Sequence, residues 1–391
     1  MNKRIRIHVK WEVIVWAIQH GEKDYSQLEK KYKLDRWQNP QKEEDYPTLK
    51  QLQNFSNDTK IPFVYLMDEQ IPKEENSFVN FRTINNLEVY PSRRLIDTIH
   101  SMQTRQEWLK DYLIEQNGEI LFQSIPKFTF DNNPQTVANK ITELLDFSKV
   151  YQRSRTDIDT FNVIRKSISS LGITVMQNGI VGNDTHRTLD VNEFRAFALY
   201  DEIAPMIFIN SCDSVRGKIF SLLHELIHIL VGENEILNVG PDSQIKKERW
   251  INQVTVNILM PENVFKDYIN DGISSQENLK RLSNKFHTSL VSTAIRAKEL
   301  NISDNCNELI KWAKEQQSKN LVIKSEKKES EKRDFYTTAL SRVDRRYASA
   351  VINSESSGEL PLRTAASMLG VGLKSYYNFV NKVLGIDYLF D

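Results

Sequence analysis

The stretch Ile219-Phe220-Ser221-Leu222-Leu223-His224-Glu225-Leu226-Ile227-His228-Ile229-Leu230-Val231-Gly232 decides the fold of this chain. It sets two histidines, four residues apart, in the middle of an apolar run. Positions four apart lie on one face of a helix, so both imidazoles can bind a single metal ion. Glu225 is then held beside that ion without ligating it. The spacing predicts two zinc ligands, His224 and His228, with a catalytic carboxylate between them.

Composition places few limits on the protein. Its 391 residues exceed one typical domain, which predicts two or three units. The formal charge of zero favours neither nucleic acid nor membrane as a partner. No stretch approaches the roughly 20 apolar residues that span a bilayer, and the N-terminus is a poor secretory signal. Cys212 and Cys306 lack metal-type spacing and imply no disulfide framework, so we expect a cytoplasmic protein.

The chain reads as five segments. The first and last are short and helical, the middle one carries the histidine pair, and a run of mixed charge separates it from the tail. We predict a helical unit at 1–75, a helical connecting region at 76–145, a metallopeptidase domain at 146–317, a charged linker at 318–334 and a helical tail at 335–391.

The middle segment also predicts strands. Asn178-Gly179 lies between the apolar runs Gly172–Met176 and Ile180–Val181, which indicates a hairpin. Two further strands are expected at Phe194–Leu199 and Met206–Asn210, the latter as an edge for an extended substrate peptide.

A tetrahedral catalytic zinc needs a third protein ligand. The segment from Gln244 to Met260 has helical character and is stopped by Pro261. It carries Glu248 on one face, with Asn252 one turn later as an orienting group. His287 is the rival third ligand, although a surface or helix-cap role suits it better.

Several segments of the sequence resemble those of the ImmA/IrrE metallo-endopeptidases. The string Glu248–Pro261 is similar to the glutamate, alanine-asparagine and leucine-methionine-proline signature of that family. Further similar segments are Arg187–Leu199, Ala204–Asn210, Pro47–Leu66, Asn80–Thr83, Arg105–Leu109 and Ala365–Val371. The resemblance implies zinc held by His224, His228 and Glu248.

The resemblance also implies a fold and a role. We expect an α+β, mainly helical protein, with a compact zincin-like domain, a small mixed or antiparallel sheet, and flanking helix-turn-helix-like units. Some family members cleave repressors, so the expected substrate is a helix-turn-helix repressor. Zinc would lower the pKa of its bound water to about 7 while Glu225 transfers the proton. Arg195 is a candidate for shaping the cleft, and Tyr200 a weak candidate for stabilising the oxyanion.

Two alternatives stay open. The protein is also compatible with a transcription regulator or anti-repressor that acts by binding, or with the toxin of a toxin–antitoxin pair. DNA contact is left open for both ends of the chain. The N-terminal unit has Trp37–Pro40 and three acids at Glu43–Asp45 where a groove-reading helix would lie, which opposes phosphate binding. The tail, Leu362–Tyr377, fits a helix-turn-helix with moderate basic character from Arg342, Arg345, Arg346 and Lys374.

Overall fold

The computed structural model describes residues 5–72, 91–116, 120–147, 155–232, 241–270, 272–302, 305–326 and 334–385. The chain forms two compact units, Met1–Phe78 with Leu87–His100, and Val79–Asn86 with Ser101–Asp391. The similar segment Asn80–Thr83 and most of the charged run, 327–333, lie outside the described residues. None of the helices in the described part of the chain is long and apolar enough to cross a membrane.

The first unit is a small helical bundle. Its elements are α1 (Trp11–Gln19), α2 (Tyr25–Tyr32), α3 (Leu34–Gln38), η1 (Glu43–Asp45), α4 (Leu49–Thr59) and η2 (Phe63–Met67). The bundle closes over a core of its own that includes Trp16, Leu52 and Phe55. The segment expected to read a DNA groove is only the five-residue α3, and its Trp37 is buried in that core.

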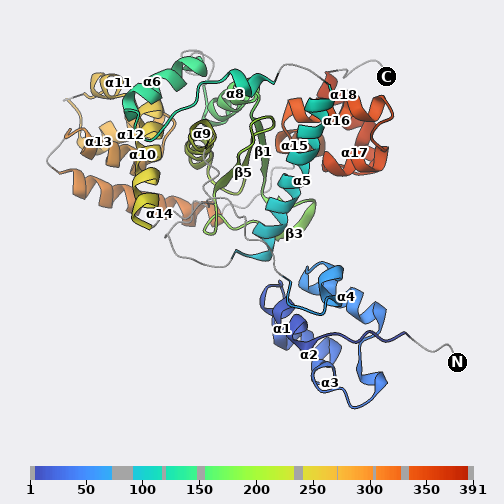
Figure 1. Ribbon diagram of the computed structural model, residues 1–391. Coiled ribbons are helices and arrows are strands. Elements are labelled where there is room, and N and C mark those ends of the chain that lie inside the picture. Colours follow the sequence, from blue (N-terminus) through green and yellow to red (C-terminus); the bar gives the residue numbers. More distant parts are fainter. Residues whose placement is uncertain are drawn as a thin grey trace. The chain divides into compact units, whose positions relative to one another are not determined.

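The second unit contains a three-stranded sheet in the order β1-β5-β4. Its strands are β1 (Thr174–Asn178), β4 (Ala196–Leu199) and β5 (Met206–Asn210). β5 pairs with β1 in parallel and with β4 in antiparallel orientation, so the sheet is mixed. Figure 1 shows β1 and β5 side by side, next to the helix α9 (Val215–Val231).

The hairpin predicted at Asn178-Gly179 is wrong. β2 (Ile180–Val181) does not pair with β1 but with β3 (Asp184–Thr188), around a turn at Gly182 whose φ is +55°. β1 is already engaged on both sides, by β5 on one edge and by hydrogen bonds to Val175 on the other. There Asp344 accepts from the Val175 amide, and Arg165 donates to its carbonyl.

The expectation that Met206–Asn210 forms an edge for a substrate strand is also wrong. β5 is the central strand, with a neighbour on each side. Its five residues are all buried. A backbone already paired on both edges has no donors or acceptors left for a further strand.

Between the N-terminal bundle and the tail, the chain also forms the following helices. They are α5 (Arg93–Glu115), α6 (Pro134–Leu144), α8 (Asp157–Ser170), α10 (Pro241–Leu259), α11 (Glu262–Asp267), α12 (Ser275–Lys285), α13 (Leu290–Glu299) and α14 (Cys306–Glu326), with the short turn η3 (Leu121–Ser124). α9 packs against β4, β5, α8 and α10, and α10 packs against α6. α9 therefore lies in the middle of one large core, and the predicted α+β, mainly helical fold is confirmed.

The tail forms a cluster of short helices on the edge of β1. Its elements are α15 (Phe335–Arg342), α16 (Arg345–Ser356), α17 (Leu362–Met368), η4 (Leu373–Ser375) and α18 (Tyr376–Leu384). Contacts join α15 to β1 and to α18, and Figure 1 shows these helices beside β1. Arg345 donates to the carbonyl of Val383 and Arg346 to that of Ser169, so both guanidinium groups serve internal packing.

Candidate metal centre

The helix α9 presents the histidine pair from the centre of the core. Ser214 caps its first turn by accepting a hydrogen bond from the amide of Gly217, and Gly232 ends it with a φ of +73°. Serine at the N-cap and a left-handed glycine after the last turn are the usual ends of a helix. Between them, most of the helix is buried, so its polar face is fixed by packing rather than by solvent.

Three side chains on α9 and α10 bring their ligand atoms together. His224 Nε2 lies 3.2 Å from His228 Nε2. Glu248 places Oε2 at 3.3 Å from His224 Nε2 and Oε1 at 3.3 Å from His228 Nε2. Among the described residues, these three form the one group of His, Cys, Asp or Glu side chains that could hold a metal ion.

Glu248 reaches this group because α10 is anchored by packing. Trp250 donates its indole N–H to the carbonyl of Asn132, and Ile251, Val254 and Ile258 are buried in the core. Burial by itself raises the pKa of the Glu248 carboxyl, but hydrogen bonds with His224 and His228 outweigh it and hold that pKa well below its ordinary value. The carboxyl is therefore ionised, as a metal ligand must be.

Glu225 follows His224 directly on α9 and is only 2% exposed. On the helix, Glu225 lies four residues after Ser221, three after Leu222 and three before His228. It therefore shares the face of the two histidines. A carboxylate in this position lies beside the group of His224, His228 and Glu248, here called the metal-type cluster, in which Glu248 offers a third possible ligand.

Two of the weaker candidates lie near this face. Asn252 is half-buried one turn after Glu248 on α10, and no hydrogen bond joins it to the three metal-type side chains in the described part of the structure. A Cβ atom added at Gly232 would lie 3.3 Å from the Tyr200 hydroxyl, which places that hydroxyl at the end of α9, one turn after His228. Burial raises the pKa of the Tyr200 hydroxyl, and the negative charges of Glu202 and Asp201 raise it further. The hydroxyl therefore remains a proton donor.

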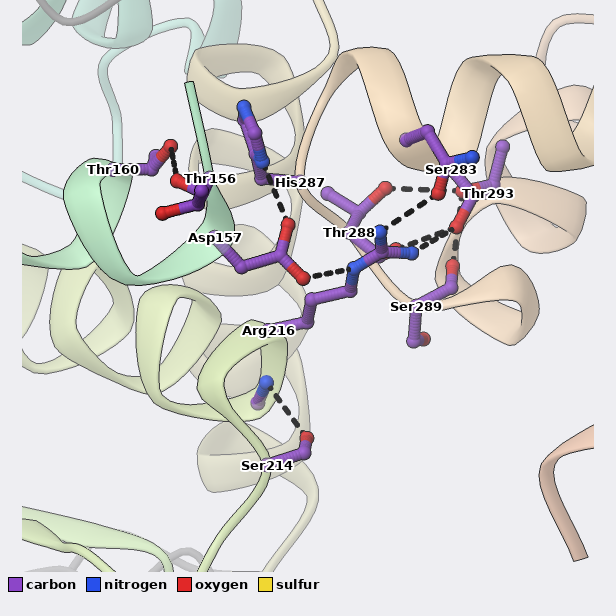
Figure 2. A network of polar contacts seen from close by, with 12 residues as sticks. Thr156, Asp157, Thr160, Ser214, Arg216, Ser283, His287, Thr288, Ser289 and Thr293 are labelled. Atoms are coloured by element: carbon purple, nitrogen blue, oxygen red, sulfur yellow. Dashed lines mark hydrogen bonds and ion pairs between the residues drawn. The ribbon is translucent and has the colours of Figure 1, made fainter. Parts of the chain in front are cut away.

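Arg195 and His287 have other partners. Arg195, the residue directly before β4, donates a hydrogen bond to the Asp213 carboxylate at 2.7 Å. His287 Nδ1 lies 2.7 Å from a carboxylate oxygen of Asp157, whose other oxygen accepts from Arg216. Figure 2 shows this network, in which Arg216 also reaches Ser283 and the carbonyl of Thr288. The structure thus places the rival ligand in an ion-pair network and not in the metal-type cluster.

Sequence reasoning missed Ser221. It precedes His224 by one helical turn, lies on the metal-facing side of α9, and lines a cavity of about 310 Å³. The available signal was a serine inside an otherwise apolar stretch, four residues before Glu225 and therefore on the same helix face. The cavity itself is built by segments far apart in the sequence, which no local pattern reveals.

The middle of the chain matches a known family. Residues 168–298 match the model of a peptidase family described as the IrrE N-terminal-like domain. This range contains β1 to β5, α9, α10 and all three metal-type side chains. No curated protein and no solved structure gave a significant match. Residues 168–298 thus carry a peptidase domain of the ImmA/IrrE type.

Proposed function

We propose that this protein is a zinc-dependent endopeptidase that cleaves a regulatory protein, a helix-turn-helix repressor, to control stress, prophage or mobile-element genes. The observation that carries the proposal is the cluster of His224, His228 and Glu248, whose ligand atoms lie 3.2 to 3.3 Å apart. Membership of a metallopeptidase family supports the same activity.

The cluster suits zinc in its donor set and its spacing. Two imidazoles and a carboxylate are a known ligand set of catalytic zinc, with one position left for water or substrate. Ligand atoms about 2.0 to 2.1 Å from a tetrahedral ion are separated by about 3.3 Å from one another. A bound zinc would lower the pKa of a coordinated water to about 7 and polarise the scissile carbonyl.

Glu225 would perform the proton transfers. Its carboxylate accepts a proton from the water that attacks the carbonyl carbon of the scissile peptide bond. It then delivers this proton to the nitrogen of the leaving amine as the carbon–nitrogen bond breaks. Its near-complete burial keeps bulk water from competing for that proton.

The regulatory substrate is supported by the organisation of the chain. A small helical bundle of residues 5–72 precedes the peptidase domain, and a helical tail follows it. The resemblance to repressor-cleaving family members points to a protein substrate of the same helix-turn-helix class. No observation on the described residues favours a toxin, or a regulator that acts only by binding, over this proposal.

The substitution Glu225→Gln tests the proposal. It keeps the shape of the side chain but removes the base, so cleavage of a helix-turn-helix repressor identified as substrate of the wild type should fall by about 10²- to 10⁴-fold. Zinc content, measured by mass spectrometry of the metal, should be unchanged. Glu262→Gln, on the exposed start of α11, is the matched control. Unchanged cleavage by the Glu225→Gln protein would exclude the assigned role, and derepression without cleavage would favour a regulator that acts by binding.

A further inference from the structure

A cavity of about 310 Å³ lies beside the first half of α9. Its walls come from the start of β4, the first turns of α9 and of α13, and α14. The lining residues that matter here are Arg195, Arg216, Gly217, Phe220, Ser221 and Ser289. Ligand pockets in proteins usually measure about 300 to 1,000 Å³, so this one suits a single side chain.

The cavity adjoins the metal-type cluster. Ser221 and Glu225 are four residues apart and His228 follows three later, so all three share one face of α9. At about 1.5 Å of rise per residue, Ser221 lies about 4.5 Å along the helix axis from His224. The rings of Phe220 and His224 stack with their centroids 6.2 Å apart. A peptide bound at the metal therefore has a neighbouring side chain within reach of the cavity.

Ser221 carries an unused hydrogen-bonding group at this place. Its side chain is completely buried, and its hydroxyl has no hydrogen-bond partner among the described residues. Buried hydroxyls almost always have a partner, because leaving one unpaired is costly. A ligand atom inside the cavity that accepts the Ser221 proton would supply the missing bond.

The electrostatics of the cavity favour a negative ligand. Ser214 and Ser289, the N-caps of α9 and α13, both line it, so two helix N-termini contribute partial positive charge. Arg195 and Arg216 also line it, each paired with one carboxylate, Asp213 and Asp157 respectively. No acidic side chain is among the lining residues in the described part of the chain. Because each arginine is neutralised by its carboxylate, the charge left at the cavity is the partial positive charge of the two helix N-termini.

We propose that this cavity receives the side chain of the substrate residue next to the scissile bond, and that it selects an acidic residue. Ser221 donates its hydroxyl to the substrate carboxylate, and the two helix N-termini stabilise the charge. Phe220 packs against the aliphatic part of that side chain. The inference rests on the proposed function, because it requires a peptide bound at the metal-type cluster.

The test measures binding of metal-anchored probes to the zinc-loaded full chain by calorimetry. Acetyl-Xaa-hydroxamates place the side chain of Xaa on the amino side of the metal-binding group, and mercaptoacetyl-Xaa-amides place it on the carboxyl side. Xaa is Glu, Gln or Lys in each series, so that size is matched between Glu and Gln while charge differs. In one series, the Glu probe should bind about tenfold more tightly than the Gln probe, and the Lys probe more weakly than both.

The Ser221→Ala protein identifies the donor. It should reduce the preference for Glu over Gln by about threefold or more, while the affinity for the Lys probe stays the same. Ser275→Ala, an exposed serine on α12, is the matched control and should leave every ratio unchanged. An unchanged Glu preference in the Ser221→Ala protein would exclude Ser221 as the donor.

The outcomes separate the two proposals. Equal binding of the Glu, Gln and Lys probes in both series would overturn the acidic subsite and leave the metallopeptidase intact. Failure of every probe to bind the zinc-loaded protein would instead overturn the accessible metal centre on which the proposed function depends.

Discussion

Individual residues set the chemistry of this protein through their neighbours. Glutamate usually lies on protein surfaces, yet the two carboxylate oxygens of Glu248 lie 3.3 Å from His224 and His228. Asp58 in the N-terminal unit is held in a similar way, by Lys23, Lys31 and Tyr32. In each case, partners contributed by another element keep a carboxyl group ionised.

If Glu248 is the third zinc ligand, as the proposed function requires, its removal should weaken zinc binding. In the Glu248→Ala protein, two imidazoles remain, which is too few for a tetrahedral site with one open position. We expect zinc affinity to fall by about tenfold or more, and cleavage to fall with it. Metal analysis after dialysis against a weak chelator measures this, with Glu262→Ala as control. Full zinc occupancy in the Glu248→Ala protein would point to a different third ligand.

Asp58 should make the stability of the N-terminal unit depend on pH. Burial alone raises the pKa of its carboxyl, but hydrogen bonds from Lys23, Lys31 and Tyr32 lower it to about 2. An unfolded aspartate titrates at about 3.9. Because the folded pKa is the lower one, the stabilisation is present above about pH 4 and is lost as the pH falls towards 2.

Thermal unfolding of the wild type and of Asp58→Asn checks this expectation. The wild type should have the higher melting temperature at pH 5, and most of the difference should be lost by pH 2. Asp35→Asn, an exposed position on α3, is the control. A difference that stays constant between pH 5 and pH 2 would contradict the assignment to the Asp58 carboxyl.

Among the secondary-structure elements, α9 and α10 together form the metal-type cluster. α9 carries the two histidines and α10 the glutamate, and the two helices pack against each other in the main core. Their polar faces were predictable because helical periodicity is local, so a spacing of four residues already fixes a shared face. The hairpin at Asn178-Gly179 failed because strand pairing is not local.

Core packing should hold α10, and hence Glu248, in place. Ile258 on α10 is fully buried, whereas Ile245 on the same helix is 43% exposed. Ile258→Ala leaves a cavity, so we expect it to lower the free energy of unfolding by about 2 to 5 kcal/mol. Ile245→Ala should change it by less than about 0.5 kcal/mol. Urea unfolding followed by circular dichroism compares the two, and equal effects would show that α10 is not packed as described.

For the whole molecule, the tail is part of the peptidase fold. Asp344 accepts hydrogen bonds from the amide of Val175 in β1 and from the Ser169 hydroxyl in α8. Ser341 accepts from Arg165 and Gln177 through its carbonyl. The tail therefore covers the outer edge of β1, which would otherwise be open to pairing with another chain.

Loss of the Asp344 side chain should therefore destabilise the peptidase domain itself. We expect Asp344→Ala to lower the free energy of unfolding by about 1 to 3 kcal/mol, because the buried Val175 amide loses its acceptor. Asp334→Ala removes an exposed helix cap of α15 and a surface ion pair with Lys382, and it serves as control. Thermal unfolding and limited proteolysis compare the variants. If Asp344→Ala matched the wild type in both, the tail would be an independent unit.

The sequence by itself determined the three metal-type residues and the helices that carry them. Helix register depends only on residues three and four positions apart. The apolar residues around His224 and those that follow Glu248 indicate which helix faces are buried. It also determined that strands precede α9, since β4 and β5 lie where their apolar runs predict.

The tertiary structure alone decided how these pieces meet. It placed β5 at the centre of the sheet, engaged Arg345 and Arg346 in internal packing, and set His287 against Asp157. It also enclosed the cavity beside Ser221 from α9, α13 and α14. These outcomes depend on contacts between residues far apart in the chain, and their free energy comes from shared burial that no single stretch of sequence contains.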